Sequence, residues 1–401
     1  MPRNTTEQAC TRTNKVYYRM ELCLYNSKNG YLEALLRGFR SSFLTPEEYK
    51  KLTEVDTLED LKSVLEDTDY GSFMMDEPSP IAVTTIAHKC KEKMAHEFNY
   101  IRAQAEEPLR TFLDYIAKEK MIDNVISLIH GTLNKKPAEE LLSRVDPLGY
   151  FPQMKAITTM DVQNSHDDVL KVLLIETPIG TYFDQYISAN ASNEKNNVTT
   201  ILNEMDIEIL RNTLKKAWLE DFYDFIRQLG GKTEEVMGHI LKSVADFRVL
   251  SVTLNTINSS LSLELQKDRN DMFPCFGYLY PEGTDRIRKC WNNETVQAAL
   301  ENYPTYYNLY EECKQFYMKN DNMRENKIVD HKIKSLEDLL YVKLVKLCET
   351  AFDQHCHFGI FYAWVKLKEQ EIRNIVWISD MILMNRKDCI DSIIPIFEPP
   401  I

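Results

Sequence analysis

Apolar residues recur along this chain at the spacing of an α-helix. Between residues 207 and 225 they return every three or four positions, which places them on one helix face. These residues are Ile207, Leu210, Leu214, Trp218, Phe222 and Phe225. The segment Tyr31–Phe43 has similar spacing, and nowhere does the chain sustain the two-residue alternation that is typical of β-strands. The pattern predicts an all-α fold.

Capping and breaking residues divide this helical pattern. Thr45 followed by Pro-Glu-Glu is a strong helix start, and Pro108 predicts a break in a mostly helical segment. Gly230 and Gly231 end the helix that contains residues 207–225. The segment Ser335–Met384 predicts a helical hairpin that turns near His355–Gly359. Only 12 of the 401 residues are glycine, which also favours long helices.

One charged run near the end of the chain has an earlier copy. Lys368–Trp377 reads KEQEIRNIVW, and Lys118–Ile126 reads KEKMIDNVI, with Lys, Glu, Ile and Asn at the same offsets. A weaker match, Ser243–Ser251, lies halfway between them. Together these segments indicate an internal repeat of about 125 residues. We expect Asn124 and Asn374 to occupy equivalent positions.

A second element repeats in the same order. Leu65–Gly71, Leu174–Gly180 and Leu300–Tyr306 each begin with Leu and an acid close behind it, continue with Thr or Tyr, and are followed by aromatic residues. Two elements that repeat in the same order predict a triplicated chain. The predicted parts are a polar tail over 1–15 and helical subdomains over 16–122, 123–247 and 248–401, the last with a C-terminal extension.

Charge and cysteine content narrow the functional classes. The net charge of −13 argues against nucleic acid, whose phosphates require a basic surface, and against adhesion to an anionic bilayer. Nine cysteines without regular spacing, behind a polar start, predict a cytosolic protein with reduced thiols. No apolar run approaches the roughly 18 residues needed to span a bilayer. We therefore expect membrane contact only through partner proteins.

Motifs that would indicate catalysis are missing. The sequence contains no phosphate-binding glycine loop, no nucleophile elbow and no paired-histidine zinc motif. His355-Cys-His357 lacks a second ligand pair at zinc spacing, and His166–Lys171 carries Lys171 where a magnesium-binding cluster would need a carboxylate. We expect a protein with no enzyme activity, no cofactor and no metal.

The run Lys368–Trp377 has two interpretations. On a helix Glu369 faces Arg373, and Gln370 faces Asn374, because each pair is four residues apart. The run is either a solvated charged face or a partly buried polar network that fixes one packing arrangement. Under the second interpretation, we expect Glu369 and Arg373 to pair, with Trp364 and Trp377 packed nearby.

Several strings resemble one protein family, the d subunits of vacuolar-type rotary proton ATPases, which are related to the C subunits of archaeal-type rotary ATPases. The most specific string is Lys366–Ile378. The others are Asn29–Arg40, Leu58–Lys62, Thr68–Gly71, Met121–Ile126, Gly131–Leu133, Ile207–Leu214, Leu279–Gly283, His357–Tyr362 and Ile394–Phe397. The chain departs from the family in a longer N-terminal tail, a longer Ser188–Thr200 loop and the extension Glu398–Ile401, and Ile372 stands where the family often has Cys.

The resemblance implies three similar helical subdomains around a pseudo-threefold axis, which form a funnel. It also implies a non-catalytic rotor subunit that sits on the proteolipid ring and receives the central stalk. The expected location is the cytosolic face of acidic organelle membranes such as the vacuole, endosome or lysosome. An all-α scaffold or adaptor without a rotary role is the alternative. The residues expected to form the structural and coupling network are Glu369, Glu371, Arg373, Asn374, Trp377, Glu119, Asn124, Arg37 and Tyr70.

Overall fold

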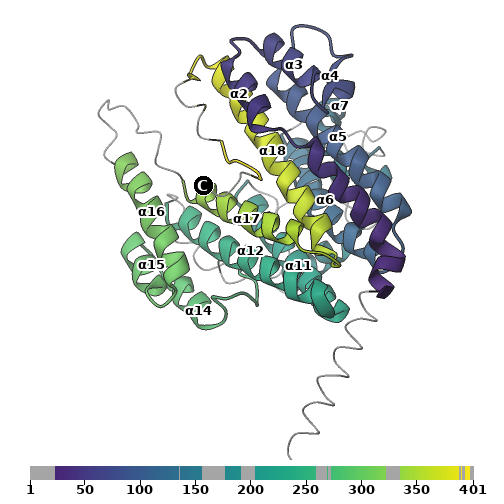
Figure 1. Cartoon of the computed structure of the whole chain (residues 1–401). Coiled ribbons are helices and arrows are strands. Elements are labelled where there is room, and N and C mark those ends of the chain that lie inside the picture. The colour runs from purple at the N-terminus through teal and green to yellow at the C-terminus, as the bar shows by residue number, and fades with distance from the viewer. Residues whose placement is uncertain are drawn as a thin grey trace, which may run out of the picture.

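A computed structural model gives the fold of most of the chain (Figure 1). It describes residues 23–134, 136–155, 177–190, 204–258, 269, 272–321, 335–387, 390 and 393–397. The predicted tail over 1–15, the segment His166–Lys171 and the extension Glu398–Ile401 lie outside these ranges, as does most of the Ser188–Thr200 loop.

Helices make up the regular structure of these ranges, and no strand occurs in them, so the predicted all-α fold is confirmed. A first helix over 23–38 continues into η1 (Phe39–Ser42). The others are α2 (Pro46–Glu54), α3 (Leu58–Glu66), α4 (Gly71–Met74), α5 (Val83–Gln104), α6 (Leu109–Leu133), α7 (Ala138–Ser143), η2 (Pro147–Gly149), η3 (Pro152–Lys155), α10 (Gly180–Asn190), α11 (Glu204–Leu229), α12 (Gly231–Asn258), α14 (Glu282–Arg288), α15 (Asn293–Leu300), α16 (Pro304–Asp321), α17 (Leu336–Asp353) and α18 (Gly359–Leu383).

Local sequence signals set several of these boundaries. Thr45 and Glu48 form the predicted capping box of α2, in which each side chain accepts a hydrogen bond from the other residue's backbone N–H. Pro108 separates α5 from α6, as predicted. Gly230, at φ +66°, adopts the left-handed conformation that glycine tolerates best, and it separates α11 from α12.

Three successive pairs of long helices dominate the fold, namely α5 and α6, α11 and α12, and α17 and α18; the last two pairs pack as hairpins, whereas α5 and α6 make few contacts with each other. The pairs also contact one another, through α11 with α6, α18 with α5 and α12 with α17. Figure 1 shows α18, in yellow, beside the purple and blue helices from the N-terminal part of the chain. The last long helix therefore packs among the first ones, which brings the N-terminal and C-terminal parts of the described chain into contact.

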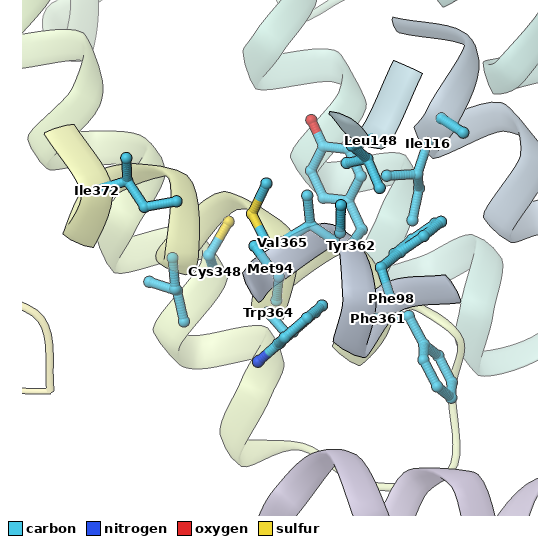
Figure 2. Close-up of a cluster of buried hydrophobic side chains, with 14 of the residues drawn as sticks. Met94, Phe98, Ile116, Leu148, Cys348, Phe361, Tyr362, Trp364, Val365 and Ile372 are labelled. Atoms are coloured by element: carbon cyan, nitrogen blue, oxygen red, sulfur yellow. The ribbon is translucent and has the colours of Figure 1, made fainter. Parts of the chain in front are cut away.

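Two hydrophobic cores lie beneath these helices. The smaller core joins the second half of α12 to α14, α15, α16 and the start of α17. The larger core involves the N-terminal helices, α11, the first half of α12, α17 and α18. Figure 2 shows part of the larger core, where side chains from α5, α6, α17 and α18 meet around Trp364. The residues labelled there are Met94, Phe98, Ile116, Leu148, Cys348, Phe361, Tyr362, Trp364, Val365 and Ile372.

The predicted repeat has a local counterpart in the long helices. Asn124, Asp246 and Asn374 each lie the same number of residues after the first residue of α6, α12 and α18 respectively. This placement supports the triplication, while the pseudo-threefold funnel stays a prediction. The predicted boundaries after residues 122 and 247 fall inside α6 and α12, so each of these helices belongs to two of the predicted subdomains.

Candidate functional site

Glu371 lies at the centre of a buried polar group on α18. Its side chain is inaccessible to solvent, and its carboxylate accepts three hydrogen bonds. The donors are the Leu44 backbone N–H at 2.7 Å, the Tyr70 hydroxyl at 2.6 Å and Lys368 Nζ at 2.8 Å. A buried carboxylate needs such partners because desolvation of an unpaired charge is costly. Glu371 therefore attaches α18 to two segments that are some 300 residues away in the sequence.

Lys368 completes this group from the preceding turn of α18. Its ammonium donates to the Ser42 carbonyl at 2.8 Å and lies 4.1 Å from the centroid of the Phe43 ring. A cation over an aromatic face is stabilised by the ring's negative π-surface. Burial, followed by the charge of Glu371, raises the pKa of the Tyr70 hydroxyl well above its ordinary value, so this group remains a donor.

Asn374 and Asn124 make the same kind of backbone contact in two different helices. The Asn374 amide donates to the Ile394 carbonyl at 2.7 Å and accepts from the Ile394 N–H at 3.2 Å. The Asn124 amide bonds both backbone groups of Asp146 in the same way, at 3.0 and 2.8 Å. The predicted contact between Gln370 and Asn374 is also present, at 2.9 Å. Each asparagine therefore anchors the chain segment that follows its own helix, at Asp146 after α6 and at Ile394 after α18.

Asp246 is the corresponding residue of α12, although the sequence comparison did not single it out as a site residue. Its carboxylate accepts from the backbone N–H groups of Tyr278 and Leu279 at 2.9 and 3.1 Å and from the Tyr306 hydroxyl at 2.6 Å. Burial raises the pKa of Asp246, against the lowering effect of these hydrogen bonds. Its signal in the sequence was weak, because the middle copy of the run retains neither the Asn nor its neighbours.

A second polar group joins α6 to α18 through four charges, Glu119, Lys120, Lys366 and Glu369. Lys366 Nζ lies 2.6 Å from Glu119 Oε2 and 3.2 Å from Glu369 Oε2. Lys120 Nζ lies 2.9 Å from Glu369 Oε1. All four side chains are less than one-fifth exposed, and the two cations balance the two anions. This charge cluster, as we call these four residues, pairs each buried charge with an opposite one.

Electrostatics keep the charge cluster ionised. Burial alone would raise the pKa of Glu369, but Lys120 and Lys366 outweigh it and lower that pKa to about 2. Burial would likewise lower the pKa of Lys366, yet Glu119 and Glu369 raise it well above its ordinary value. The cluster is therefore charged throughout the neutral range.

The lowered pKa of Glu369 predicts that this carboxylate contributes to stability in a pH-dependent way. The pKa of Glu369 is lower in the folded state than the unfolded value of about 4.3, so its contribution is present above that pH and is lost as the pH falls toward 2. We expect the stability difference between the native chain and Glu369→Gln to be largest at neutral pH and to shrink steadily below pH ~4.3. Urea unfolding of both proteins at pH 7, 5, 4 and 3 measures it. A difference that stayed constant across this series would contradict the assigned pairing.

The predicted pair between Glu369 and Arg373 is not formed. Glu369 binds Lys120 and Lys366, whereas exposed Arg373 donates to Gln370 Oε1 at 2.8 Å and lies 3.5 Å from the centroid of the Tyr341 ring. The reason is burial, because the carboxylate of Glu369 faces α6 and two cations there satisfy it. The two tryptophans that we expected near this pair differ in burial: Trp364 is fully buried, whereas Trp377 is 38% exposed.

The exposed position of Arg373 predicts a small effect of its removal. We expect Arg373→Ala to lower the free energy of unfolding by about 0.5–1 kcal/mol, because only an exposed cation–π contact and one hydrogen bond are lost. We also expect this loss to add to that of Glu369→Ala in the double variant, since the two side chains share no contact. Denaturant unfolding of the three variants tests both statements, and strong non-additivity would restore the original pairing.

Arg37 forms a separate contact near the turn between α17 and α18. Its guanidinium pairs with Glu33 at 2.8 Å and donates to the Phe352 carbonyl at 2.8 Å and to the Gln354 carbonyl. The Cys356 N–H donates to the other oxygen of Glu33 at 3.2 Å. The first described helix thus holds the end of α17, while a coupling role of Arg37 stays a prediction.

The predicted network residues therefore fall into several groups. Glu371 and Tyr70 share one, which neighbours Asn374 through Tyr49, and Glu119 and Glu369 share the charge cluster. Asn124, Arg37, Arg373 and Trp377 lie outside these two groups. The lysines that complete both groups were missed in the sequence, namely Lys368 beside Glu371 and Lys120 and Lys366 in the charge cluster. Only Lys368 has a lysine, Lys118, at its offset in the earlier copy of the run, and Lys118 belongs to neither group.

Within the described ranges no group of three or more His, Cys, Asp or Glu side chains could hold a metal ion. His357 is fully buried, and burial lowers its pKa to about 4, whereas His355 is exposed beside Glu33. Across those same ranges, no helix has the length and apolarity that crossing a membrane requires.

The sequence of this helical chain matches a known protein family. The sequence profile of the ATP synthase (C/AC39) subunit family matches residues 32–393, which is most of the chain. The chain belongs to this family, and the resemblance found in its sequence strings is confirmed.

Its relatives include parts of two kinds of rotary ATPase. The V-type proton ATPase subunit d of Dictyostelium discoideum is 42% identical over 377 residues, which cover 94% of this chain and 97% of the relative. Subunit d1 of the same pump in Arabidopsis thaliana is 36% identical over 95% of this chain and the whole of the relative. The C subunit of the A-type ATP synthase of Methanocaldococcus jannaschii is 24% identical over 58% of this chain and 55% of the relative.

Proposed function

We propose that this chain is a non-catalytic central-rotor subunit of the vacuolar-type proton pump. In this role it sits on the cytosolic end of the proteolipid ring and couples the central stalk, which is driven by ATP hydrolysis, to ring rotation and proton transport. The observation that carries the proposal is the likeness to V-type proton ATPase d subunits over nearly the full length of both chains.

The buried polar contacts support a mechanical role. A part that transmits torque must resist deformation, and charged contacts between distant segments favour one packing arrangement over others. Glu371 joins α18 to the N-terminal helices, and the charge cluster joins α18 to α6. These contacts would let the helix pairs turn as one body between ring and stalk.

The proposed location is the cytosolic face of acidic organelle membranes, where the protein is peripheral and touches the membrane only through partner proteins. Its proposed partners are the proteolipid ring and the central-stalk subunits. The chain is proposed to work without a cofactor and to hydrolyse no ATP itself. The net charge of −13 suits a basic stalk foot, which would provide electrostatic complementarity at the contact.

Depletion of the protein in its native cells tests this function. We expect loss of organelle acidification and release of the soluble motor from membranes, with both restored by the native chain. Lys50→Met, a change at an exposed lysine outside the predicted network, should restore them equally well and serves as the matched control. Normal acidification with a fully assembled pump after depletion would reject the rotary role and favour the scaffold alternative.

A further inference from the structure

A cavity of about 550 Å³ lies between α11, α12 and α17. This volume falls in the range of about 300–1,000 Å³ that is typical of small-molecule sites. Much of its wall is apolar, and polar side chains complete the lining. The apolar lining comprises Ile209, Val244, Phe247, Val252, Met272, Leu340, Tyr341 and Leu344. The polar lining includes Asn212, Arg248, Ser251 and Asn255.

Arg248 is the cation of this cavity. One of its terminal nitrogens donates to the Asn212 carbonyl at 3.0 Å and to Asn212 Oδ1 at 2.9 Å, so the guanidinium is held in place by neutral groups. Its Nε is buried and has no hydrogen-bond partner among the described residues. Burial lowers the pKa of Arg248 to about 10, against the opposing effect of Glu119 and Asp123. The group is still protonated at neutral pH and retains donor capacity.

The nearby carboxylates already have other partners. Glu119 lies 2.6 Å from Lys366, and Asp123 lies 2.6 Å from Lys215. Of the two acids that line the cavity, Glu208 pairs with Arg211 at 2.9 Å, and Glu337 is exposed in the first turn of α17. A partly buried cation that pairs with no carboxylate among the described residues, beside an apolar wall, is complementary to an anion with an apolar body.

We propose that this cavity binds a small amphipathic organic anion, of the class of medium-chain carboxylates. The carboxylate binds Arg248, with Asn212 as a further polar contact, and the alkyl chain packs along the apolar side chains of α12 and α17. Binding there would brace the junction of the second and third helix pairs. The inference stands apart from the rotary role, because it rests on the cavity alone.

Calorimetric titration of the full chain with octanoate tests the site, with octanol and inorganic phosphate as comparison probes. We expect saturable octanoate binding about ten- to hundredfold tighter than octanol binding, since a charge-assisted hydrogen bond is lost in the alcohol. Phosphate, which lacks the apolar body, should bind too weakly to measure. Equal affinity for octanoate and octanol, or no saturable octanoate binding, would overturn the proposal.

Variants locate the binding to the cavity. Arg248→Gln should weaken octanoate binding at least tenfold, and Leu344→Trp should abolish it by filling the cavity. Arg288→Gln is the matched control, because Arg288 lies on α14, pairs with Asp285 and does not line the cavity. If Arg248→Gln fails to fold, Leu344→Trp tests whether octanoate binds in this cavity, and the comparison with octanol tests whether its carboxylate is needed. Unchanged octanoate binding in a folded Arg248→Gln or Leu344→Trp variant would place the ligand elsewhere and refute the site.

Discussion

Replacing Glu371 with alanine is expected to lower the free energy of unfolding by about 3–5 kcal/mol. The substitution leaves the ammonium of Lys368 buried without its anion and removes the acceptor of the Leu44 N–H and the Tyr70 hydroxyl. Part of the cost is the cavity left by the side chain. Chemical denaturation of the native and variant chains, followed by circular dichroism, measures the change.

Two further variants separate charge from shape in this experiment. Glu371→Gln keeps an acceptor oxygen but leaves Lys368 uncompensated, so adding Lys368→Met should recover part of the lost stability. Glu235→Ala is the control: its side chain is 69% exposed and its carboxylate pairs with Lys232, so we expect a loss of at most about 1 kcal/mol. A similarly small loss for Glu371→Ala would mean that this carboxylate does not stabilise the packing of α18.

Lys366→Met is expected to have an effect of similar size, about 3–5 kcal/mol, for a different reason. Without Lys366, the charge cluster retains the carboxylates of Glu119 and Glu369 but only one of its cations, Lys120. Both carboxylates are largely buried, so their repulsion is poorly screened by solvent. Guanidinium chloride unfolding gives the loss, and high salt should relieve little of it.

A compensating change identifies the source of this loss. Adding Glu119→Gln to Lys366→Met removes the excess negative charge, so the double variant should be more stable than Lys366→Met alone. Lys50→Met is the control, because that lysine is 76% exposed and lies 4.0 Å from Glu54; we expect a change of at most about 1 kcal/mol. If Glu119→Gln instead worsened the loss, the penalty would come from lost packing of the lysine side chain.

The sequence by itself determined the fold class and much of the local structure. Helical spacing over 207–225, the capping box at Thr45 and the break at Pro108 depend on neighbouring residues, and all three are confirmed. Such signals act within a few residues, so the chain alone contains the information. The string Lys366–Ile378 also indicated the family that the comparison confirmed.

Only the tertiary structure decided which side chains meet. Arg373 lies one turn from Glu369 on the same helix, yet the partners of Glu369 include Lys120, about 250 residues earlier in the chain. Glu371 likewise binds the Leu44 N–H and Tyr70, which nothing in its own sequence neighbourhood indicates. The physical reason is desolvation: packing buries one face of α18, and each charge on that face must pair with whatever opposite charge or donor the neighbouring helices bring to it.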